Sequence, residues 1–217
     1  MQMKRTKLVV IDHGFGTAKV FSGLFSSVAL YHNKRQITKD SVILFEGGTD
    51  IGVRFYGEKR GERTQLPHYL RDAYEAEAFY TAMRFGAACI GICRGAQLLT
   101  ALNNGKIIQD VSNHTKDHLV TVKDGETFLS TSCHHQMMNP FVLPPEKYEI
   151  IGWTATPISN YYLDGNDEQS FIPEIEPEIV YFPFTKCLCI QGHPEWALPS
   201  SRYRKICNDL AKQLLLL

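Results

Sequence analysis

Short apolar runs alternate with longer amphipathic stretches through the first half of this 217-residue sequence. Residues 7–12, 41–46 and 87–92 are predicted to be buried strands, because each is a short, mostly apolar run. Residues 70–86 and 94–104 are predicted to be helices, and each ends beside a glycine that suits a helix stop. Strands and helices in this order are typical of a parallel sheet that is covered by helices on both faces.

The helix predicted at residues 70–86 has the clearest pattern. Ala73, Ala76, Tyr80 and Met83 recur at the spacing of one helical face. Phe79 lies beside them and Gly86 is a suitable stop, so the pattern predicts a helix over residues 70–86.

The second half of the sequence is richer in predicted strands. They cover residues 118–123, 127–131, 148–154, 178–182 and 187–191, and a last helix is predicted from about residue 200. The mixed stretch 14–30 is expected to contain a helix, and residues 160–177, with two prolines, are expected to form an exposed loop or a hairpin tip. No repeat or low-complexity linker separates these segments. We expect one α/β domain over residues 1–217, with a central, mostly parallel sheet flanked by helices and an antiparallel, strand-rich extension.

Composition narrows the classes of partner and location. Lys+Arg and Asp+Glu both number 23, and a balanced charge argues against nucleic acid or an anionic membrane as the main partner. The apolar run at residues 8–11 is too short for a signal peptide, and no segment has the length that crosses a bilayer. The six cysteines of so long a chain without an export signal are expected to be reduced, which predicts a cytoplasmic protein.

The segment GICRGAQ, residues 91–97, lies where an apolar strand is predicted to meet a helix. Cys93 is a candidate nucleophile there, because flanking glycines permit a tight turn that raises the side chain above the sheet edge. The helix N-terminus behind it favours a thiolate and predicts a lowered pKa for Cys93. A buried cysteine is more often a small apolar core residue, and we assign Cys89, which lacks the glycines, to the core. The glycines favour the nucleophile for Cys93.

The segment QGHPEW, residues 191–196, follows another apolar strand and is expected at the same sheet edge. His193 and Glu195 flank Pro194, so the carboxylate can reach the far ring nitrogen and hold the imidazole in one tautomer. A cysteine nucleophile needs such a base and such an orienting group. A His-Pro-Glu sequence by itself is usually only a turn.

Other residues with the chemistry of metal ligands lack the spacing of a site. Residues 133–135 read Cys-His-His, and Cys187 and Cys189 lie two apart on one face of a predicted strand, which is not the turn spacing of zinc ligands. We therefore predict no metal ion and no cofactor. His114 and His118 are expected to be solvated loop residues. The Gly-Phe-Gly sequence at residues 14–16 lacks the third glycine of the dinucleotide-binding motif, so it is weak support for a phosphate site.

Together, the segments at 91–97 and 192–196 resemble the class I glutamine amidotransferase superfamily, whose triad is Cys-His-Glu. Further segments are similar to its γ-glutamyl hydrolase and γ-glutamyl-GABA hydrolase (peptidase C26) branch: GGTD at 47–50, YGE at 56–58, RDAYE at 71–75 and SCHHQ at 132–136. The resemblance runs in order from about residue 40 to residue 197. It departs from the branch at Gly192, where those hydrolases carry Trp, just before Tyr56, where a proline is missing, and through the first forty residues.

The resemblance implies a flavodoxin-like amidotransferase fold and a set of site residues. Cys93 would be the nucleophile, His193 the base, and Glu195 the residue that orients the base. The backbone N–H groups of Gly48 and Arg94 would form the oxyanion hole.

The resemblance also implies the pocket and the reaction. Gln97 would lie near the bound glutamyl group, and His135 and Gln136 would line the pocket. The reaction would cleave the γ-amide of glutamine, or of a γ-glutamyl amide, through a γ-glutamyl thioester. Ammonia would then pass to a separate synthase chain. One alternative is a stand-alone γ-glutamyl-amine hydrolase, and another is a catalytically silent binding module, which the complete triad argues against.

Overall fold

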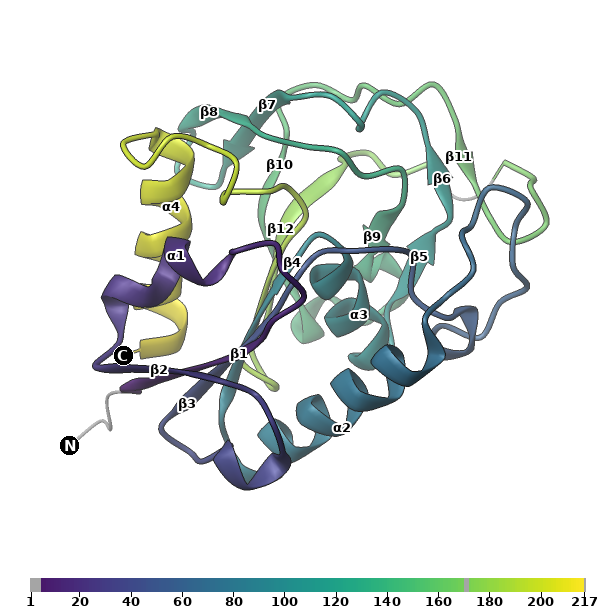
Figure 1. The fold of residues 1–217 in the computed structure, drawn as a ribbon. Coiled ribbons are helices and arrows are strands. Elements are labelled where there is room, and N and C mark those ends of the chain that lie inside the picture. The colour runs from purple at the N-terminus through teal and green to yellow at the C-terminus, as the bar shows by residue number, and fades with distance from the viewer. Residues whose placement is uncertain (1–4, 170–171, 217) are drawn as a thin grey trace.

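The computed structural model describes residues 5–169 and 172–216. A nine-stranded sheet runs through it in the order β2-β1-β3-β4-β13-β12-β10-β7-β8 (Figure 1). The first five of these strands are parallel: β2 (Ser27–Leu30), β1 (Lys7–Ile11), β3 (Ser41–Phe45), β4 (Ala88–Ile92) and β13 (Cys187–Ile190). The last four pair antiparallel: β12 (Pro177–Phe182), β10 (Glu149–Thr154), β7 (His118–Val122) and β8 (Thr127–Ser130). The predicted parallel sheet with an antiparallel extension is confirmed.

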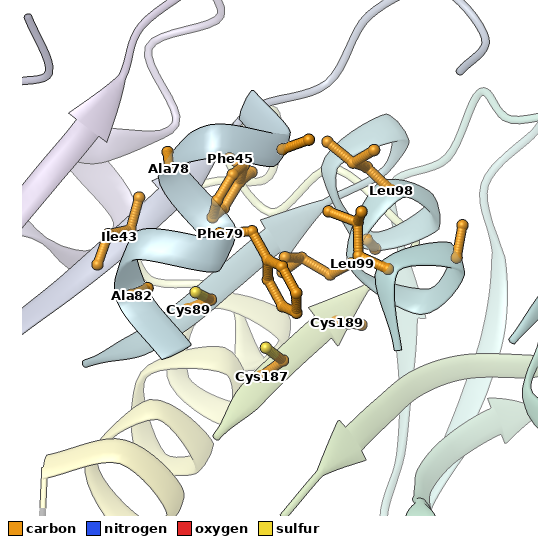
Figure 2. Close-up of a cluster of buried hydrophobic side chains, with 14 of the residues drawn as sticks. Ile43, Phe45, Ala78, Phe79, Ala82, Cys89, Leu98, Leu99, Cys187 and Cys189 are labelled. Atoms are coloured by element: carbon orange, nitrogen blue, oxygen red, sulfur yellow. The ribbon is translucent and has the colours of Figure 1, made fainter. Parts of the chain in front are cut away.

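Helices cover both faces of the parallel half. The helices are α1 (Ala18–Phe21), α2 (Tyr69–Phe85), α3 (Arg94–Leu102) and α4 (Arg202–Ala211). Alternate strand residues enter two separate cores. Ile43 and Cys89 pack with α2 and α3, whereas Val42 and Ile90 pack with α1 and α4. Figure 2 shows the first core, in which Phe79 lies among Leu98, Leu99, Cys187 and Cys189.

Strands that are buried on both faces read as continuous apolar runs, which is why the sequence predicted β1, β3 and β4 to within one or two residues. The helix predicted at residues 70–86 is confirmed as α2, but the residues at helical spacing make up only part of its buried side. Ala76 is buried, but Tyr80 is 60% exposed, and Asp72 and Glu75 are buried instead.

Two other expectations need correction. The stretch 14–30 holds only the short helix α1 before an unexpected edge strand, β2. Residues 160–177 contain a hairpin tip, because Leu163 forms an antiparallel bridge with Gln169. Their described part is not wholly exposed, however, since β11 (Tyr162–Leu163) pairs with β6 (Asp110–Val111) and Glu176 is fully buried. A second small sheet joins β5 (Lys106–Ile108) to β9 (Met137–Asn139).

The helices were also compared with the length that a lipid bilayer requires. Among the described residues, no helix is long and apolar enough to cross a membrane.

Candidate functional site

A cavity of about 350 Å³ opens where β3, β4 and β13 end. These three strands are neighbours and parallel, so the residues that follow them meet at one edge of the sheet. Of the residues predicted for the site, six line the cavity: Gly48, Cys93, Gln97, His135, Gln136 and His193. Segments nearly 150 residues apart in the sequence therefore share one pocket.

Cys93 lies at the turn between β4 and α3 in a strained conformation, with φ 50° and ψ −109°. Glycines make this turn possible. A Cβ atom at Gly91 would stand 2.6 Å from the carbonyl group of Gly95, and one at Gly95 would overlap the carbonyl oxygen of Phe45. The expected glycine-bracketed turn is present, and it holds the thiol at the pocket wall.

The pKa of Cys93 differs from the expected direction. Burial raises the pKa of this thiol, and the backbone N–H of Arg94, at the start of α3, only partly opposes that effect. The helix N-terminus was expected to dominate, but Cys93 is 7% exposed, and desolvation of the thiolate has the stronger influence. A nucleophile in this position needs a base to remove its proton.

His193 is held as a base would be. Its Nδ1 lies 2.7 Å from Glu195 Oε1, and its ring stacks on Trp196 with the centroids 3.7 Å apart and the planes 6° apart. Arg204 of α4 donates hydrogen bonds to the carbonyl oxygens of Pro194 and Glu195 at 2.8 and 2.7 Å, so the turn that carries both side chains is fixed.

Gly47 lies between the turn that carries Cys93 and the imidazole of His193. A Cβ atom at Gly47 would stand 3.0 Å from His193 Cε1 and 3.8 Å from Cys93 Cβ. Only a residue without a side chain leaves Cys93 and His193 facing the same space.

A second thiol also faces the imidazole. Cys133 Sγ lies 3.6 Å from His193 Nε2, and Cys133 is an exposed, free cysteine. Burial of the thiol, together with the negative charge of Glu195, raises the pKa of Cys133. The sequence did not single out Cys133 as a pocket residue; its place beside two histidines was the available signal.

The loop after β3 is tied down by an arginine of α2. Arg71 Nη2 donates to the carbonyl oxygens of Glu46 and Gly47 at 3.0 and 2.7 Å. Gly48 follows with φ +145°, and a Cβ atom there would overlap the Arg71 guanidinium. Gly48 therefore keeps its backbone at the cavity wall.

The Arg94 side chain points away from the cavity into a buried ion cluster. It contacts Asp72 and Glu75 of α2, and all three are at most 1% exposed. Arg71 Nε adds a contact to Glu75 at 2.9 Å. Burial raises the pKa of Glu75, but the His13 hydrogen bond and the charges of Arg94 and Arg71 outweigh it and lower the pKa to about 2. This cluster joins α2, α3 and the Gly48 loop.

The far end of the cavity is polar. Gln97 Nε2 donates to the Gln136 carbonyl oxygen at 3.2 Å. His135 lies between two carboxylates, with Nδ1 3.1 Å from Asp110 Oδ1 and Nε2 3.2 Å from Asp50. The hydrogen bond to Asp50 is the largest of the effects that raise the pKa of His135.

Sequence reasoning assigned no role to seven residues that line the cavity: Phe15, Thr49, Asp50, Gln65, Cys133, His134 and Trp196. Phe15 comes from the poorly matching first forty residues. Its loop folds around Glu46, whose carboxylate accepts the N–H groups of His13 and Thr17 at 2.7 and 3.0 Å. Within residues 14–16, the N–H groups of Gly14 and Phe15 donate to the carboxylates of Asp12 and Glu46 at 3.0 and 3.4 Å, so the structure argues against the phosphate site considered there.

The departure at Gly192 has a packing reason. A Cβ atom at Gly192 would overlap Ser130 Oγ and stand 2.6 Å from the Tyr203 hydroxyl. Tyr203 of α4 stacks on Phe128 and is buried, so it occupies the space beside residue 192.

The expectation for His114 and His118 was wrong. Both are buried, and they lie with His134 around Glu178, away from the pairing that was considered with Cys187 and Cys189. Those two cysteines are core residues, as is Cys89. The signal in the sequence was the alternation along the strand predicted at 118–123. His118 lies two residues before Val120, and side chains two apart on a strand face the same side.

Comparisons with known proteins agree with this geometry. The profile of the peptidase C26 family matches residues 28–141, just over half of the chain. The glutamine amidotransferase-like protein YvdE of Lactococcus lactis is 23% identical over 193 residues, which cover 79% of this chain and 73% of that protein.

Two solved structures share the fold. A glutamine amidotransferase from Thermotoga maritima aligns with a TM-score of 0.60 at 13% identity, over 96% of this chain and 85% of that one. A protein from Thermoplasma acidophilum that is described as part of a GMP synthase aligns with a TM-score of 0.61 at 12% identity, over 94% and 90%. This chain therefore belongs to the peptidase C26 family and has the fold of class I glutamine amidotransferases.

Proposed function

We propose that this chain is a cysteine-dependent amide hydrolase that cleaves the γ-amide of glutamine or of a γ-glutamyl amide. One observation carries the proposal: Cys93, in a strained turn, and a His193–Glu195 pair joined at 2.7 Å face the same cavity. Nucleophile, base and orienting carboxylate are the three parts that acyl transfer by a thiol requires.

The reaction starts with a protonated thiol, because burial raises the pKa of Cys93. Glu195 accepts the Nδ1–H of His193, which leaves Nε2 as the base. As the sulfur attacks the amide carbon, the proton passes to Nε2 and the carbonyl electrons move to the oxygen. The N–H groups of Gly48 and Arg94 receive that oxyanion.

Collapse of the tetrahedral intermediate releases the amine, which takes the proton from His193, and leaves a γ-glutamyl thioester on Cys93. His193 then removes a proton from water, and the hydroxide attacks the thioester. Glutamate is released, and the sulfur of Cys93 takes the proton back from His193. The amide oxygens and carboxylates at the polar end of the cavity, from Gln97 and Asp50, suit the amino group of the glutamyl moiety.

The similarity to a protein described as part of a GMP synthase supports a partner chain that accepts ammonia. A purified chain that is fast on a γ-glutamyl amine and indifferent to any synthase would favour the stand-alone hydrolase. We also propose that the protein is cytoplasmic, because all six cysteines are free. We propose that residues 1–217 work as one domain, because both cores lie on the same sheet.

A glutamine analogue with a diazo-ketone group tests the proposal. The reagent is expected to add to Cys93 in wild type, and the adduct is located by peptide mass mapping. Cys133 lines the same cavity and serves as an internal comparison, while Cys93→Ala should remain unlabelled at low reagent excess. An adduct confined to Cys133, or no adduct at saturating reagent, contradicts the proposed nucleophile.

A further inference from the structure

Three histidines and a glutamate meet in the antiparallel half of the protein. His114 and His134 come from loops, His118 from β7 and Glu178 from β12. All four are buried; the largest exposed fraction is 8%, for His118. One nitrogen or oxygen from each lies within 4.8 Å of those of the other three. We call these four residues the His₃Glu cluster.

A single carboxylate oxygen is the centre of the His₃Glu cluster. Glu178 Oε1 lies 3.2 Å from His114 Nδ1, 3.2 Å from His118 Nε2 and 3.3 Å from His134 Nε2. None of these contacts has the direction of a hydrogen bond, and within residues 5–169 and 172–216 none of the four atoms has another hydrogen-bond partner. Buried polar atoms left in this state cost free energy, so the distances do not describe a satisfied network.

Each ring has one nitrogen that faces away from Glu178. The partner of that nitrogen determines whether the nitrogen that faces Glu178 carries a lone pair. His118 Nδ1 lies 2.9 Å from the Lys116 carbonyl oxygen, and His134 Nδ1 lies 2.9 Å from that of Gln136. A carbonyl oxygen only accepts, so each Nδ1 carries a hydrogen, and in a neutral ring the lone pair is then on Nε2. His114 Nε2 likewise faces Glu176 Oε2 at 3.3 Å, which leaves Nδ1 for the centre.

Three lone pairs beside one carboxylate oxygen repel one another unless a cation lies among them. Protonating all three rings instead would bury three positive charges on rings whose centroids are 4.8–6.2 Å apart. Among the residues that the structure describes, Glu178 and Glu176 are the carboxylates within ion-pair distance that would oppose those charges. A metal ion satisfies the same four atoms with one centre of charge. Metal-binding histidines usually donate their other N–H to a carbonyl or carboxylate, as His118 and His134 are placed to do, while His114 Nε2 has only the 3.3 Å ion-pair contact with Glu176 Oε2.

We propose that the His₃Glu cluster binds one Zn²⁺ ion through His114 Nδ1, His118 Nε2, His134 Nε2 and Glu178 Oε1. Zinc bonds of about 2.0–2.1 Å in a tetrahedron place neighbouring ligand atoms about 3.3–3.4 Å apart. The three distances to Glu178 Oε1 already match that spacing, and the widest pair would close by about 1.4 Å.

Four protein ligands in a buried site make this a structural rather than a catalytic ion. It would join β7 and β12 to the segment that ends in His135 and Gln136, and the ligand His134 lines the cavity together with those two residues. The ion would thus hold the pocket wall in place without contacting the substrate.

The test measures zinc directly. Cys93 and Cys133 are first replaced by alanine, because thiols beside His193 could bind zinc adventitiously. This background protein is stripped with a chelator, dialysed against buffered Zn²⁺ and analysed for metal content. We expect about one equivalent per chain and a rise in Tm on zinc binding. Glu178→Gln and His118→Ala should weaken zinc binding at least about ten-fold, whereas His32→Ala, at an exposed histidine, should not.

X-ray absorption of the zinc-loaded background protein covers the case in which a ligand variant fails to fold. Nitrogen and oxygen ligands at about 2.0–2.1 Å with the outer-shell scattering of three imidazoles are expected. Less than about a tenth of an equivalent of zinc after reconstitution overturns the proposal. So does stoichiometric binding that survives both ligand variants, or a spectrum without imidazole scattering.

Discussion

Replacing Gly47 with alanine should separate catalysis from folding. The added methyl carbon would stand 3.0 Å from His193 Cε1, whereas carbon atoms in contact prefer about 3.5–4.0 Å. The imidazole must then withdraw by about 0.5 Å. It cannot move freely, because it stacks on Trp196 and its Nδ1 is held by Glu195. A misplacement of 1 Å can cost about 100-fold in rate, so we expect kcat to fall about ten-fold.

Glutamate release from glutamine and from a γ-glutamyl amine measures kcat and KM, and urea unfolding measures stability. We expect KM to change little, because the cavity keeps its polar end, and the free energy of unfolding to fall by about 1 kcal/mol from local overpacking. Labelling of Cys93 by the diazo-ketone should slow in parallel with kcat, since His193 must take the thiol proton.

Gly23→Ala is the matched control, because no atom lies within 4 Å of a Cβ at Gly23. Its kcat and stability should equal those of wild type. A Gly47→Ala protein with kcat within two-fold of wild type would refute the argument that His193 and Cys93 need this gap. A loss of stability large enough to explain the loss of rate would refute the claim that the effect is local.

Three further predictions concern individual side chains. Cys93→Ala should abolish turnover and leave Tm unchanged within about 2 °C, because it removes the nucleophile and little volume. Cys133→Ala should keep most of the activity. The reverse pattern in paired assays would reassign the nucleophile. Glu195→Gln should lower kcat by about 10²- to 10⁴-fold at nearly unchanged KM, because the imidazole loses its fixed tautomer, and an unchanged pH–rate profile at full kcat would contradict this. The pKa of Glu75 is lowered from 4.5 to about 2, so its ionised form stabilises the fold above about pH 4.5 and this contribution is lost as the pH falls toward 2. Glu75→Gln should therefore be less stable by on the order of 3 kcal/mol at pH 7 and lose less stability on acidification, which urea unfolding from pH 7 to pH 3 would measure.

The parallel half of the fold was predictable because its strands are buried on both faces. β3 and β4 are continuous apolar runs followed by glycine-rich turns, and such runs have few other structures open to them. The edge strand β2 escaped prediction because Val28 and Leu30 are about half exposed and its neighbours are polar or small. Short strands such as β6 carry no periodicity from which to predict them.

The residues of the candidate site were likewise predictable only in part. Cys93 and His193 follow parallel strands, so topology alone brings them to one edge. Cys133 and Asp50 reach the cavity from connections whose path depends on tertiary packing, and the two histidines beside Cys133 were the one local signal of its position. The burial of Asp72 and Glu75 on α2 was not predicted, because their charged partners include residues from other parts of the fold: Arg94 of α3 and, for Glu75, His13.

The antiparallel extension is part of the candidate site rather than an addition beside it. The N–H of His193 donates to the Thr131 carbonyl oxygen at 2.7 Å, and the Thr131 hydroxyl donates back to the carbonyl oxygen of His193. Thr131 directly follows β8, and three residues later His134 enters the His₃Glu cluster. A shift of this segment would therefore move the backbone that carries the imidazole and the polar wall formed by His135. Stability of the extension and alignment of His193 are thus expected to rise and fall together.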